Sequence, residues 1–517
     1  MPSCLLSASA TAPAVGTTPA SGVNSTVPPA SGGNITIRST HPRVSFGRGS
    51  SFAVAFLLSL VAAGCVHYQP RPITAEVTLD DFEARRLDAP EIRRFLGAQV
   101  GVKDWPPESW DLGSLTLAAL FFSPDLDVAR ARWGVVEAGT ITAGARPNPS
   151  LGASVGYNSS SGAGINPWIP DVLLGLPIET AGKRGIRISK AQSLSEAARL
   201  DVLAAAWAVR GRLRLAYVDL FRAESLETLL QQLNELQARS LVVLEAQLDA
   251  GVISANELTQ ARIATGRTRL AALEAARERD RARVALAAAV GVPSTALDGV
   301  ALRFDDLGNP ATDLPTSEMR RRAVVHRADI LSALAVYESA QAALQLEIAK
   351  QYPDIDIGAG YQLDQVDSKW TLGIALTLPM FNRNQGPIAE AEAARGEAAA
   401  EFLALQSRVL AEVDGAVVSY RGALETAAAI EEMLTGLEQR EAAARTAYRL
   451  GATSKLELLS AEVEIAAGRV ARIEALASAQ RAAGDLENAI QSPLDTAEWV
   501  LVTPARGAGE MESTNEE

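Results

Sequence analysis

The sequence predicts an exported α+β membrane protein in which a helix–strand–strand–helix unit occurs twice. Three observations lead to this fold class: landmarks that recur about 200 residues apart, short segments in which apolar residues alternate with period two, and two proline-free stretches of 115 and 105 residues. Apolar residues make up 48% of the chain and aromatic residues only 5%, so closely packed helices rich in Ala and Leu are expected.

The internal repeat rests on three pairs of landmarks that follow one another in the same order. The first is the start of a strand, Pro149–Tyr157 and Pro353–Tyr361, at an offset of 204 residues. The second is a Leu-Pro pair, Leu176-Pro177 and Leu378-Pro379, at an offset of 202. The third is a helix start led by Gly, Gly251–Ala261 and Gly451–Ala461, at an offset of 200. Offsets this similar are not expected by chance, so each copy should form the same structural unit.

Each copy should begin with a helix and continue with two strands. The helices are expected at Pro124–Ala145 and Val324–Gln351. In the second copy, the first strand has one apolar face, made of Ile355, Ile357, Ala359, Tyr361 and Leu363, and one face of Asp, Gly and Gln residues. Its partner is expected at Trp370–Leu378 with the same alternation. The strands of the first copy are expected at Pro149–Tyr157 and Trp168–Ile178, the latter interrupted by Pro170.

Strands of about ten residues with one apolar and one small or polar face are typical of a transmembrane β-barrel. An antiparallel sheet on a soluble core has the same local pattern. Export of the chain, which its N-terminal signal indicates, favours the barrel. Four strands cannot close a barrel, and an open sheet edge is not stable in lipid. The sheet is therefore expected to be shared among several chains.

A long helical pattern follows each strand pair. It extends from Gly185 to Gly251 in the first copy and from Gly386 to Gly451 in the second. At 1.5 Å per residue each run is roughly 100 Å long, which implies coiled-coil-like packing. Beyond each Gly the chain is expected to return as a helix of about 40 residues, so that two long hairpins project from the strands.

The N-terminal region carries a predicted export signal. The apolar run Ser51–Gly64 follows Arg43 and Arg48 and is too short to span a bilayer, as in a secretory signal. Its Val-Ala-Ala-Gly-Cys ending resembles a bacterial lipoprotein signal, which implies acyl chains such as palmitate on Cys65. A plain signal peptide with a free Cys65 is the alternative. Val66 after the Cys favours the outer membrane.

Several classes of function are not supported by the sequence. The net charge of −13 disfavours a nucleic-acid partner. Two Cys and three His provide no disulfide framework and no metal site, and no cofactor is expected. Gly175–Arg184 is not a phosphate loop, because six residues rather than four separate its glycines. Gly182–Arg184 should instead mark a strand-to-helix junction. No nucleophile–base pair stands out, so an enzyme is not expected.

These features resemble the TolC-like outer membrane factor family of Gram-negative efflux systems. The resemblance covers most of residues 111–493 through the duplicated unit, and its most specific motif is the hairpin YRLGATSKLELLSA at Tyr448–Ala461. Two further segments, PIETAGKR at Pro177–Arg184 and LPMFNRNQG at Leu378–Gly386, resemble the CzcC-type heavy-metal efflux branch.

The resemblance implies a homotrimer in which twelve strands form an outer-membrane β-barrel and twelve helices form a periplasmic tunnel. Such a protein is a passive duct. Its implied partners are a periplasmic adaptor (membrane fusion) protein and an inner-membrane resistance-nodulation-division transporter. The implied location is the cell outer membrane, with the chain anchored in outer-membrane lipid at Cys65.

The resemblance also assigns roles to the second hairpin tip. In the family, acids six and nine residues after the tip Gly line the periplasmic aperture; here Glu457 keeps the acid and Ser460 does not. A ring of three Glu457 carboxylates would favour cations, although a solvated helix residue is the alternative. Tyr448 matches a position that helps latch the closed state, but Thr453 stands where its Arg partner is found. A packing role for Tyr448 is equally open.

Gly251 and Gly451 stand where family members contact the adaptor, and left-handed helix corners alone would also explain both glycines. The expected function is the outer-membrane channel of a tripartite efflux system. The resemblance to the CzcC-type branch implies that its substrates are heavy-metal cations. The alternatives are a multidrug efflux or type I secretion duct and, from another class, an exported coiled-coil structural or adhesin protein. The four alternating strands argue against the last.

The domains expected from the sequence are six. Residues 1–64 are a disordered extension with the signal peptide, and residues 65–110 are an N-terminal tether with an equatorial segment. Residues 111–300 are the first repeat, 301–320 an inter-repeat linker, 321–493 the second repeat and 494–517 a disordered C-terminal tail.

Overall fold

The structure is a computed structural model that describes residues 68–99, 105–162, 164–308, 310, 315–365 and 367–494. The predicted signal at Ser51–Gly64, Cys65 and residues 495–517 lie outside the described residues. The chain divides into a smaller unit, Ser7–Phe82, and a larger unit that contains residues 83–517. Helix α2 (Ala75–Glu83) crosses this boundary, and all other described helices and strands belong to the larger unit.

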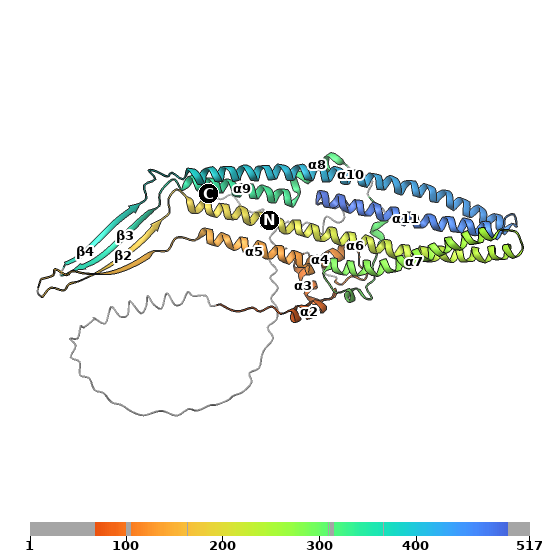
Figure 1. Ribbon diagram of the computed structural model, residues 1–517, viewed down its shortest axis with the longest axis horizontal. Coiled ribbons are helices and arrows are strands. Elements are labelled where there is room, and N and C mark those ends of the chain that lie inside the picture. Colours follow the sequence, from red (N-terminus) through yellow and green to blue (C-terminus); the bar gives the residue numbers. More distant parts are fainter. Residues whose placement is uncertain are drawn as a thin grey trace, which may run out of the picture. The chain divides into compact units, whose positions relative to one another are not determined.

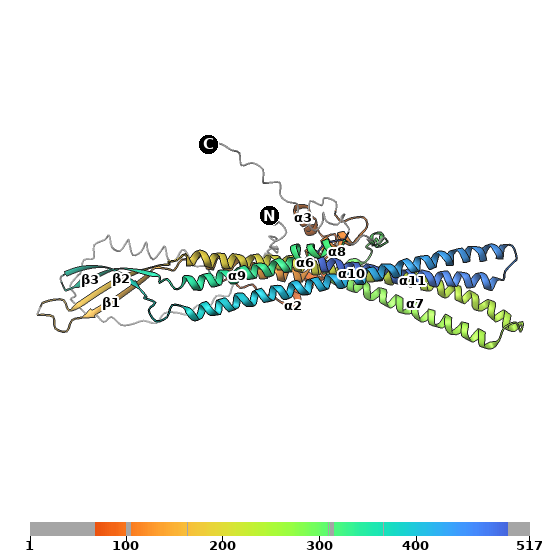
Figure 2. The ribbon, with the colours of Figure 1, turned by 90° about the horizontal axis from the view of Figure 1, so that it is seen from above.

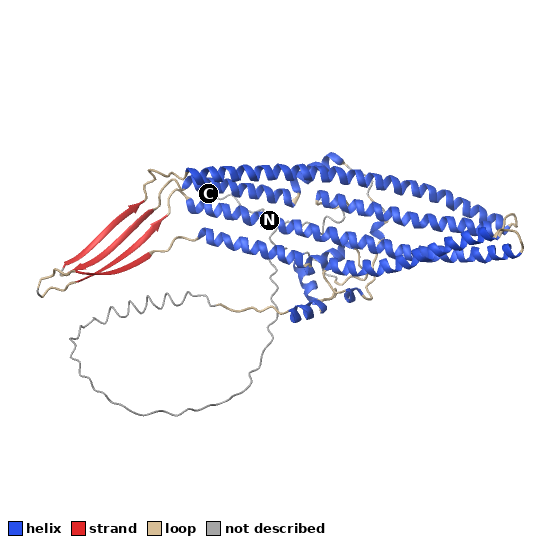
Figure 3. Ribbon diagram, in the orientation of Figure 1, coloured by secondary structure: helices blue, strands red, loops and turns tan. Residues whose placement is uncertain are grey.

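The larger unit joins a small sheet to a layer of long helices (Figure 1, Figure 3). Its helices and strands, in chain order, are α3 Pro90–Gln99, α4 Leu112–Phe122, α5 Pro124–Gly144, β1 Ser150–Tyr157, β2 Trp168–Ile178, α6 Lys183–Asp249, α7 Ala255–Val290, η1 Ser294–Leu297, η2 Asp305–Leu307, α8 Thr316–His326, α9 Ala328–Ala349, β3 Ile355–Asp364, β4 Asp367–Leu376, α10 Gln385–Arg449 and α11 Lys455–Ile490. The predicted unit is therefore present twice, as α5–β1–β2–α6–α7 and as α9–β3–β4–α10–α11.

The four strands form one antiparallel sheet in the order β1-β2-β3-β4. The central pair joins the two copies, with Ile178 opposite Ile355 at one end and Asp171 opposite Gln362 at the other. Pro170 does not end β2, which continues to Trp168 opposite Tyr157. The outer edges of β1 and β4 have no partner strand within the described chain.

The register places apolar residues opposite apolar residues across all four strands. On one face, Leu174 lies between Leu151 and Ala359, and Ala359 lies opposite Leu372. Side chains on this face are exposed: Trp370 is 80% exposed and Leu372 is 78% exposed. The other face carries mainly Gly, Ser, Thr and Asp residues. A one-residue slip of any strand would mix the two faces, so the alternation fixes the register.

Aromatic pairs mark the same end of both strand hairpins. The rings of Tyr157 and Trp168 are 5.0 Å apart, and those of Tyr361 and Trp370 are 4.8 Å apart. Both pairs lie on the apolar face. Tyr157 and Trp168 border the connecting loop, whereas three further residue pairs separate Tyr361 and Trp370 from the turn at Gln365. Aromatic residues with one polar atom are favoured where an apolar surface meets water.

The glycines of the second copy make room for one large residue on the opposite face. The side chain of Leu173 from β2 lies 3.6 Å from a Cβ atom built on Gly358 and 3.4 Å from one built on Gly360. A Cβ at Gly360 would also come within 2.4 Å of the Thr371 hydroxyl. Glycine at position 360 therefore allows β2, β3 and β4 to pack closely on this face.

The boundaries of β4 differ from the prediction. The strand begins at Asp367, because Asp367–Lys369 pair with Gln362–Asp364 across a tight turn at Gln365, whose φ is 62°. It ends at Leu376, since β3 begins at Ile355, directly opposite, and offers no further partner. Leu378, which the alternation placed in the strand, lies in the following loop.

The long helices agree closely with the expected lengths. Helix α6 has 67 residues and α10 has 65, and each returning helix, α7 or α11, has 36. Helices α9 and α11 pack between α6 and α10, while α5 and α7 pack on the other side of α6 (Figure 1). Figure 2 shows the α6–α7 hairpin diverging from the α10–α11 hairpin toward their tips.

Two apolar cores lie where short helices cover the long ones. The first gathers residues of α3, α4, α6 and α7 and includes Trp105, Trp110, Leu115, Leu213, Tyr217, Leu286 and Val290. The second gathers residues of α8, α10 and α11 and includes Met319, Val413, Tyr420 and Leu486. Burial raises the pKa of Tyr420 to about 12 and raises the pKa of Tyr217 further. Both phenols are therefore neutral hydrogen-bonding groups at physiological pH.

The helix that leads into the second strand pair begins later than predicted. Val324 belongs to α8, and the chain bends at Arg327, whose extended backbone separates α8 from α9. Arg327 is 7% exposed and donates to Asp329, Glu412 and the Ala489 carbonyl. Burial alone would raise the pKa of Asp329, but hydrogen bonds and the charge of Arg327 outweigh it and hold that pKa below its usual value.

A buried ion pair ties the first copy to the second. Arg210 of α6 and Glu487 of α11 are 3% and 2% exposed, and their charged groups are 2.7 Å apart. Arg214 lies 3.4 Å from the same carboxylate, which also accepts from the Leu494 amide at 3.0 Å. The Glu487 carboxylate therefore has three partners in the core, and its loss would leave the buried Arg210 without this counter-charge.

Among the described residues, no single helix is long and apolar enough to cross a membrane. Helices α4 and α5 satisfy that test only together, as a pair bent by 49°.

The buried pair predicts an unequal response to two charge-removing substitutions. Glu487→Ala should lower the free energy of unfolding by about 3–5 kcal/mol, because it leaves Arg210 buried without its carboxylate. Glu474→Ala, which breaks a more exposed pair with Arg222, should cost about 1 kcal/mol or less. Chemical denaturation in detergent, followed by circular dichroism, measures both. Equal losses of unfolding free energy in the two variants would show that the buried pair contributes no more to stability than the exposed pair.

Candidate functional site

The residues assigned to the aperture and to docking lie at two similar helix corners. The first tip connects α6 to α7 through residues 250–254, and the second connects α10 to α11 through residues 450–454. Gly251 and Gly451 have φ values of 72° and 71°. Both are therefore left-handed corners, for which glycine has the lowest conformational cost.

The two corners close with the same backbone hydrogen bonds. In the first, the amides of Gly251 and Val252 donate to the carbonyls of Leu248 and Gln247 at 2.9 and 2.8 Å. In the second, the amides of Gly451 and Ala452 donate to those of Tyr448 and Ala447 at 3.0 and 2.8 Å. This pair of bonds is the Schellman motif, which satisfies the last carbonyls of a helix.

The start of each returning helix is also the same. Ser254 and Ser454 are N-cap residues, and their hydroxyls accept from the amides of Glu257 and Glu457. A Ser followed three residues later by Glu is a preferred helix start, and the carboxylate is favoured near the positive end of the helix. Glu457 therefore has a helix-stabilising role that Glu257 shares, and both side chains are exposed.

One contact of Glu457 has no equivalent at the first tip. The Thr453 hydroxyl donates to the Glu457 carboxylate, whereas Ile253 occupies the corresponding position beside Glu257. This hydrogen bond orients the Glu457 carboxylate. From the sequence, Thr453 was considered only as the residue that replaces the latch Arg. The unused signal was its position, four residues before a Glu in the first turn of a helix.

The other predicted tip residues are at the surface. Tyr448, in the last turn of α10, is 41% exposed, and its carbonyl accepts from Gly451. Ser460 is exposed on the second turn of α11, next to the buried Leu459. The tip thus gathers Tyr448, Thr453 and Glu457 around one turn.

Ion pairs across the two hairpins are reversed in sign. In the first hairpin, Glu245 on the outgoing helix pairs with Arg262 on the returning helix at 2.8 Å. In the second, Arg445 on the outgoing helix pairs with Glu462 on the returning helix at 3.4 Å. The positions correspond at the repeat offset of 200 residues. The tips therefore share a backbone and differ in charge pattern, which sequence reasoning missed although the offset contained the signal.

Ion pairs connect the two hairpins at a distance from their tips. Arg222 and Asp219 of α6 pair with Glu474 and Arg481 of α11, at 2.7 and 2.6 Å. Nearer the tips, ion pairs such as Glu245–Arg262 connect the two helices of one hairpin instead. Ion pairs thus connect the two hairpins in the part nearer the sheet, whereas the hairpins diverge at their tips (Figure 2).

The predicted strand-to-helix junction also exists. Lys183 is the first residue of α6, follows the left-handed residues Ala181 and Gly182, and is 6% exposed. Its ammonium group donates to the Tyr352 carbonyl and to the Asp354 carboxylate at 2.6 and 2.7 Å. The start of α6 is therefore fastened to the chain that leads into β3.

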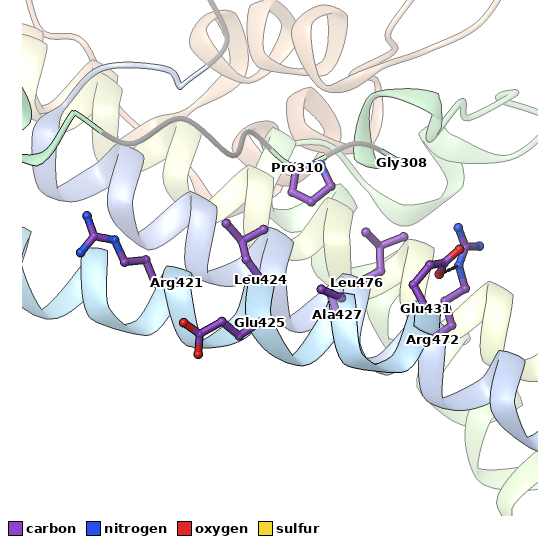
Figure 4. Close-up of a pocket in the computed structure, with 10 residues that line it drawn as sticks. Gly308, Pro310, Arg421, Leu424, Glu425, Ala427, Glu431, Arg472 and Leu476 are labelled. Carbon is purple, nitrogen blue, oxygen red and sulfur yellow. Dashed lines mark hydrogen bonds and ion pairs between the residues drawn. The ribbon is translucent and has the colours of Figure 1, made fainter. Parts of the chain in front are cut away.

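A groove of about 840 Å³ lies beside α10 and α11, far along the helices from the tips (Figure 4). Leu424 and Leu476 give it an apolar floor, and Glu431 and Arg472 pair with each other at its edge at 2.8 Å.

Within the part of the chain that the structure describes, no group of three or more His, Cys, Asp or Glu residues could hold a metal ion.

Comparison with known proteins connects this architecture to channels. Residues 117–292 and 319–491 match the model of the family described as outer membrane efflux protein. The chain is 26% identical over 387 residues to the cobalt-zinc-cadmium resistance protein CzcC of Cupriavidus metallidurans, an alignment that covers 72% of this chain and 90% of CzcC.

Solved structures of similar fold are outer-membrane channels. The outer membrane protein VceC of Vibrio cholerae superposes with a TM-score of 0.59 at 22% identity, covering 74% of this chain and 97% of VceC. CusC, whose structures are described in terms of transmembrane channel formation, superposes with a TM-score of 0.60 at 19% identity, covering 76% and 96%. At these identities the likeness concerns the fold.

The tip geometry predicts a local effect of the Ser caps. Ser454→Ala should cost about 1 kcal/mol at the start of α11 and increase amide hydrogen exchange at Glu457 about fivefold, because the amide loses its acceptor. Ser460→Ala, one turn further along and outside the cap, is the control and should leave that exchange unchanged. Equal hydrogen-exchange rates of the Glu457 amide in both variants would show that the Ser454 cap does not stabilise this helix start.

Proposed function

Because the chain belongs to the outer membrane efflux protein family, we propose that it is the outer-membrane channel of a tripartite system that exports heavy-metal cations. The observation that carries the proposal is the junction of an amphipathic four-stranded sheet with helices roughly 100 Å long. The sheet suits a membrane and the helices suit a conduit that extends from it. The metal class rests on the similarity to CzcC.

The exposed apolar face supports placing the sheet in lipid. Large apolar side chains of β4 and β1, among them Trp370, Leu372 and Leu151, are 75–80% exposed. Such a surface is not stable in water and is typical of the outward face of a membrane barrel. The opposite face, with Ser154, Asp171 and Gln362 in one row, would line an aqueous lumen.

The open edges support a trimer. β1 and β4 each leave one row of backbone groups without a strand partner, and such edges are not stable in a bilayer. Pairing β4 of one protomer with β1 of the next closes a barrel of twelve strands in three chains. The helix layer has the corresponding flanks, since α5 and α7 lie on one side and α10 lies on the other (Figure 1).

Side chains on the two flanking helices are complementary. Helix α7 exposes Ile263, Leu270, Arg277 and Val284 at seven-residue spacing, and it also exposes Arg267, Arg269 and Arg281. Helix α10 exposes small residues at the same spacing, Gly415, Gly422, Ala429 and Gly436, together with Glu425, Glu432 and Glu438. Apolar residues against small ones and Arg against Glu favour contact between α7 and α10 of neighbouring protomers.

The helical part would then be a periplasmic tunnel with its tips toward the inner membrane. Gly251 and Gly451 are exposed corners where an adaptor protein could dock, and energy would come from an inner-membrane resistance-nodulation-division transporter. The chain itself would conduct passively. An acyl anchor at Cys65 would hold it to outer-membrane lipid.

Glu457 supplies the proposed cation preference of the aperture. Three symmetry-related carboxylates, each held by a Thr453 hydroxyl, would attract multivalent cations and oppose anions. Tyr448 and Ser460 would lie beside this ring. A drug-efflux or type I secretion duct is the alternative within the same fold.

Deletion of the gene tests the metal class. We expect sensitivity to cobalt, zinc, cadmium or copper, measured as a fall in the minimum inhibitory concentration and restored by a plasmid copy. Unchanged metal tolerance with increased drug sensitivity would favour the alternative duct.

A pair of tip variants tests the aperture. Glu457→Ala should weaken the block of single-channel current by multivalent cations in planar bilayers, because the carboxylate ring is removed. Glu257→Ala changes the same helix-start position at the other tip and is the matched control. An equal block in wild type and Glu457→Ala would place the aperture elsewhere.

A further inference from the structure

The two strand-to-helix junctions of the chain correspond in sequence but differ in chemistry. Aligned on Leu176-Pro177 and Leu378-Pro379, Glu179 corresponds to Phe381, and the left-handed residue Gly182 corresponds to Asn384. The first junction is polar and the second is apolar. Both follow the same end of the sheet, where Ile178 and Leu376 flank Ile355.

The first junction is fastened to the body of the protein. Glu179 pairs with Arg187 of α6, and the Thr180 amide and hydroxyl donate to the Asp354 carboxylate and the Pro353 carbonyl at 2.9 and 2.7 Å. Its residues therefore face protein.

The second junction directs apolar side chains away from the protein. Leu378, Met380 and Phe381 are 65%, 69% and 99% exposed. Arg383, two residues after the ring, is exposed as well. A fully exposed Phe beside two other exposed apolar residues is unusual on a surface that contacts only water.

Local hydrogen bonds keep this exposed loop in one conformation. The Asn382 side chain accepts from the Asn384 amide at 2.8 Å, and the Gln385 side chain accepts from the Arg383 amide at 3.0 Å. The Asn384 side chain donates to the Glu347 carbonyl of α9 at 2.7 Å. The loop is thus built to present its apolar side chains outward, at little further entropic cost on binding.

The position of the loop along the sheet suits a membrane boundary. Trp370 and Phe381 are eleven residues apart in the chain, which is at most about 36 Å in extended backbone. With the strand tilt of about 40° usual in membrane barrels, the height is at most about 28 Å, which does not exceed the thickness of the hydrocarbon core. The turn in which the Met380 amide donates to the Leu378 carbonyl shortens it further. Phe381 would then lie at the boundary opposite the Tyr361–Trp370 pair.

We propose that Leu378, Met380 and Phe381 form a phospholipid anchor at the periplasmic boundary of the outer membrane, with Arg383 facing the lipid phosphates. The inference rests on the proposed membrane placement of the sheet and adds a contact that one copy has and the other lacks. The anchor fixes how deep the sheet sits, because the apolar loop and the aromatic pairs at the far end favour opposite boundaries.

Site-directed spin labelling of the full chain in phosphatidylethanolamine–phosphatidylglycerol bilayers tests the anchor. One nitroxide is attached at Phe381→Cys, at Leu372→Cys on the lipid-facing strand, or at Ser407→Cys on α10. Cys4 and Cys65 are replaced by Ser, so that the protein is held in the bilayer without the proposed acyl anchor. Collision with oxygen reports lipid contact, and collision with a water-soluble nickel chelate reports contact with water.

We expect the label at 372 to be accessible to oxygen and shielded from nickel, and the label at 407 to show the reverse. The label at 381 should lie between them, at the depth of the phosphate groups. A label at 381 as open to nickel as the one at 407 would overturn the anchor while leaving the membrane sheet intact. A label shielded from both collision partners would also overturn it, since a neighbouring protomer would then cover Phe381. If position 372 also faces water, the proposed function itself fails.

A second measurement separates lipid contact from folding. Phe381→Ser should lower the fraction of folded protein inserted into vesicles more than twofold, whereas Phe381→Trp should preserve it. Glu179→Gln, at the corresponding position of the first junction, should leave insertion unchanged. Equal insertion of Phe381→Ser and wild type would contradict the anchor.

Discussion

The antiparallel pairing of β2 with β3 is the interaction on which the rest of the chain depends. It joins strands from the two copies, so a duplicated sequence becomes one continuous sheet. Because its register sets Leu174 beside Ala359 and Gly175 beside Gly358, the apolar and the small faces continue across all four strands. It also leaves β1 and β4 at the edges of the sheet, where the proposed neighbouring chains would attach. The start of α6 is fastened next to this pair through Lys183 and Asp354.

The duplication explains why one chain can build both ends of a long conduit. Each copy supplies a strand hairpin, a helix roughly 100 Å long, and a corner that sends the chain back. Copying the unit preserved the backbone of the corners at Gly251 and Gly451 while the side chains around them diverged. The reversed pairs Glu245–Arg262 and Arg445–Glu462 and the contrast between Glu179 and Phe381 are two examples. The shared backbone keeps the geometry, and the divergent residues give each copy its own surface.

Much of the fold could be predicted because its signals are local. Alternation around Tyr361 and Trp370 identified the strands, and the proline-free runs identified the long helices. The positive φ of both tip glycines was implied by their place between helices. Features that depend on distant partners could not be predicted. The bend at Arg327 depends on contacts with Glu412 and Ala489. At the candidate site, two local signals were present in the sequence but not used. Thr453 stands four residues before Glu457, and Ser454 stands three residues before it, as Ser254 does before Glu257.

The Arg210–Glu487 pair has a consequence for the order in which the chain is completed. Arg210 belongs to the first copy, but the carboxylate that neutralises it lies 277 residues later, in the last described helix. The first copy alone therefore lacks the Glu487 carboxylate that Arg210 contacts in the finished fold. Because α6 and α11 come from different copies, the core around Arg210 is complete only when the last described helix is in place.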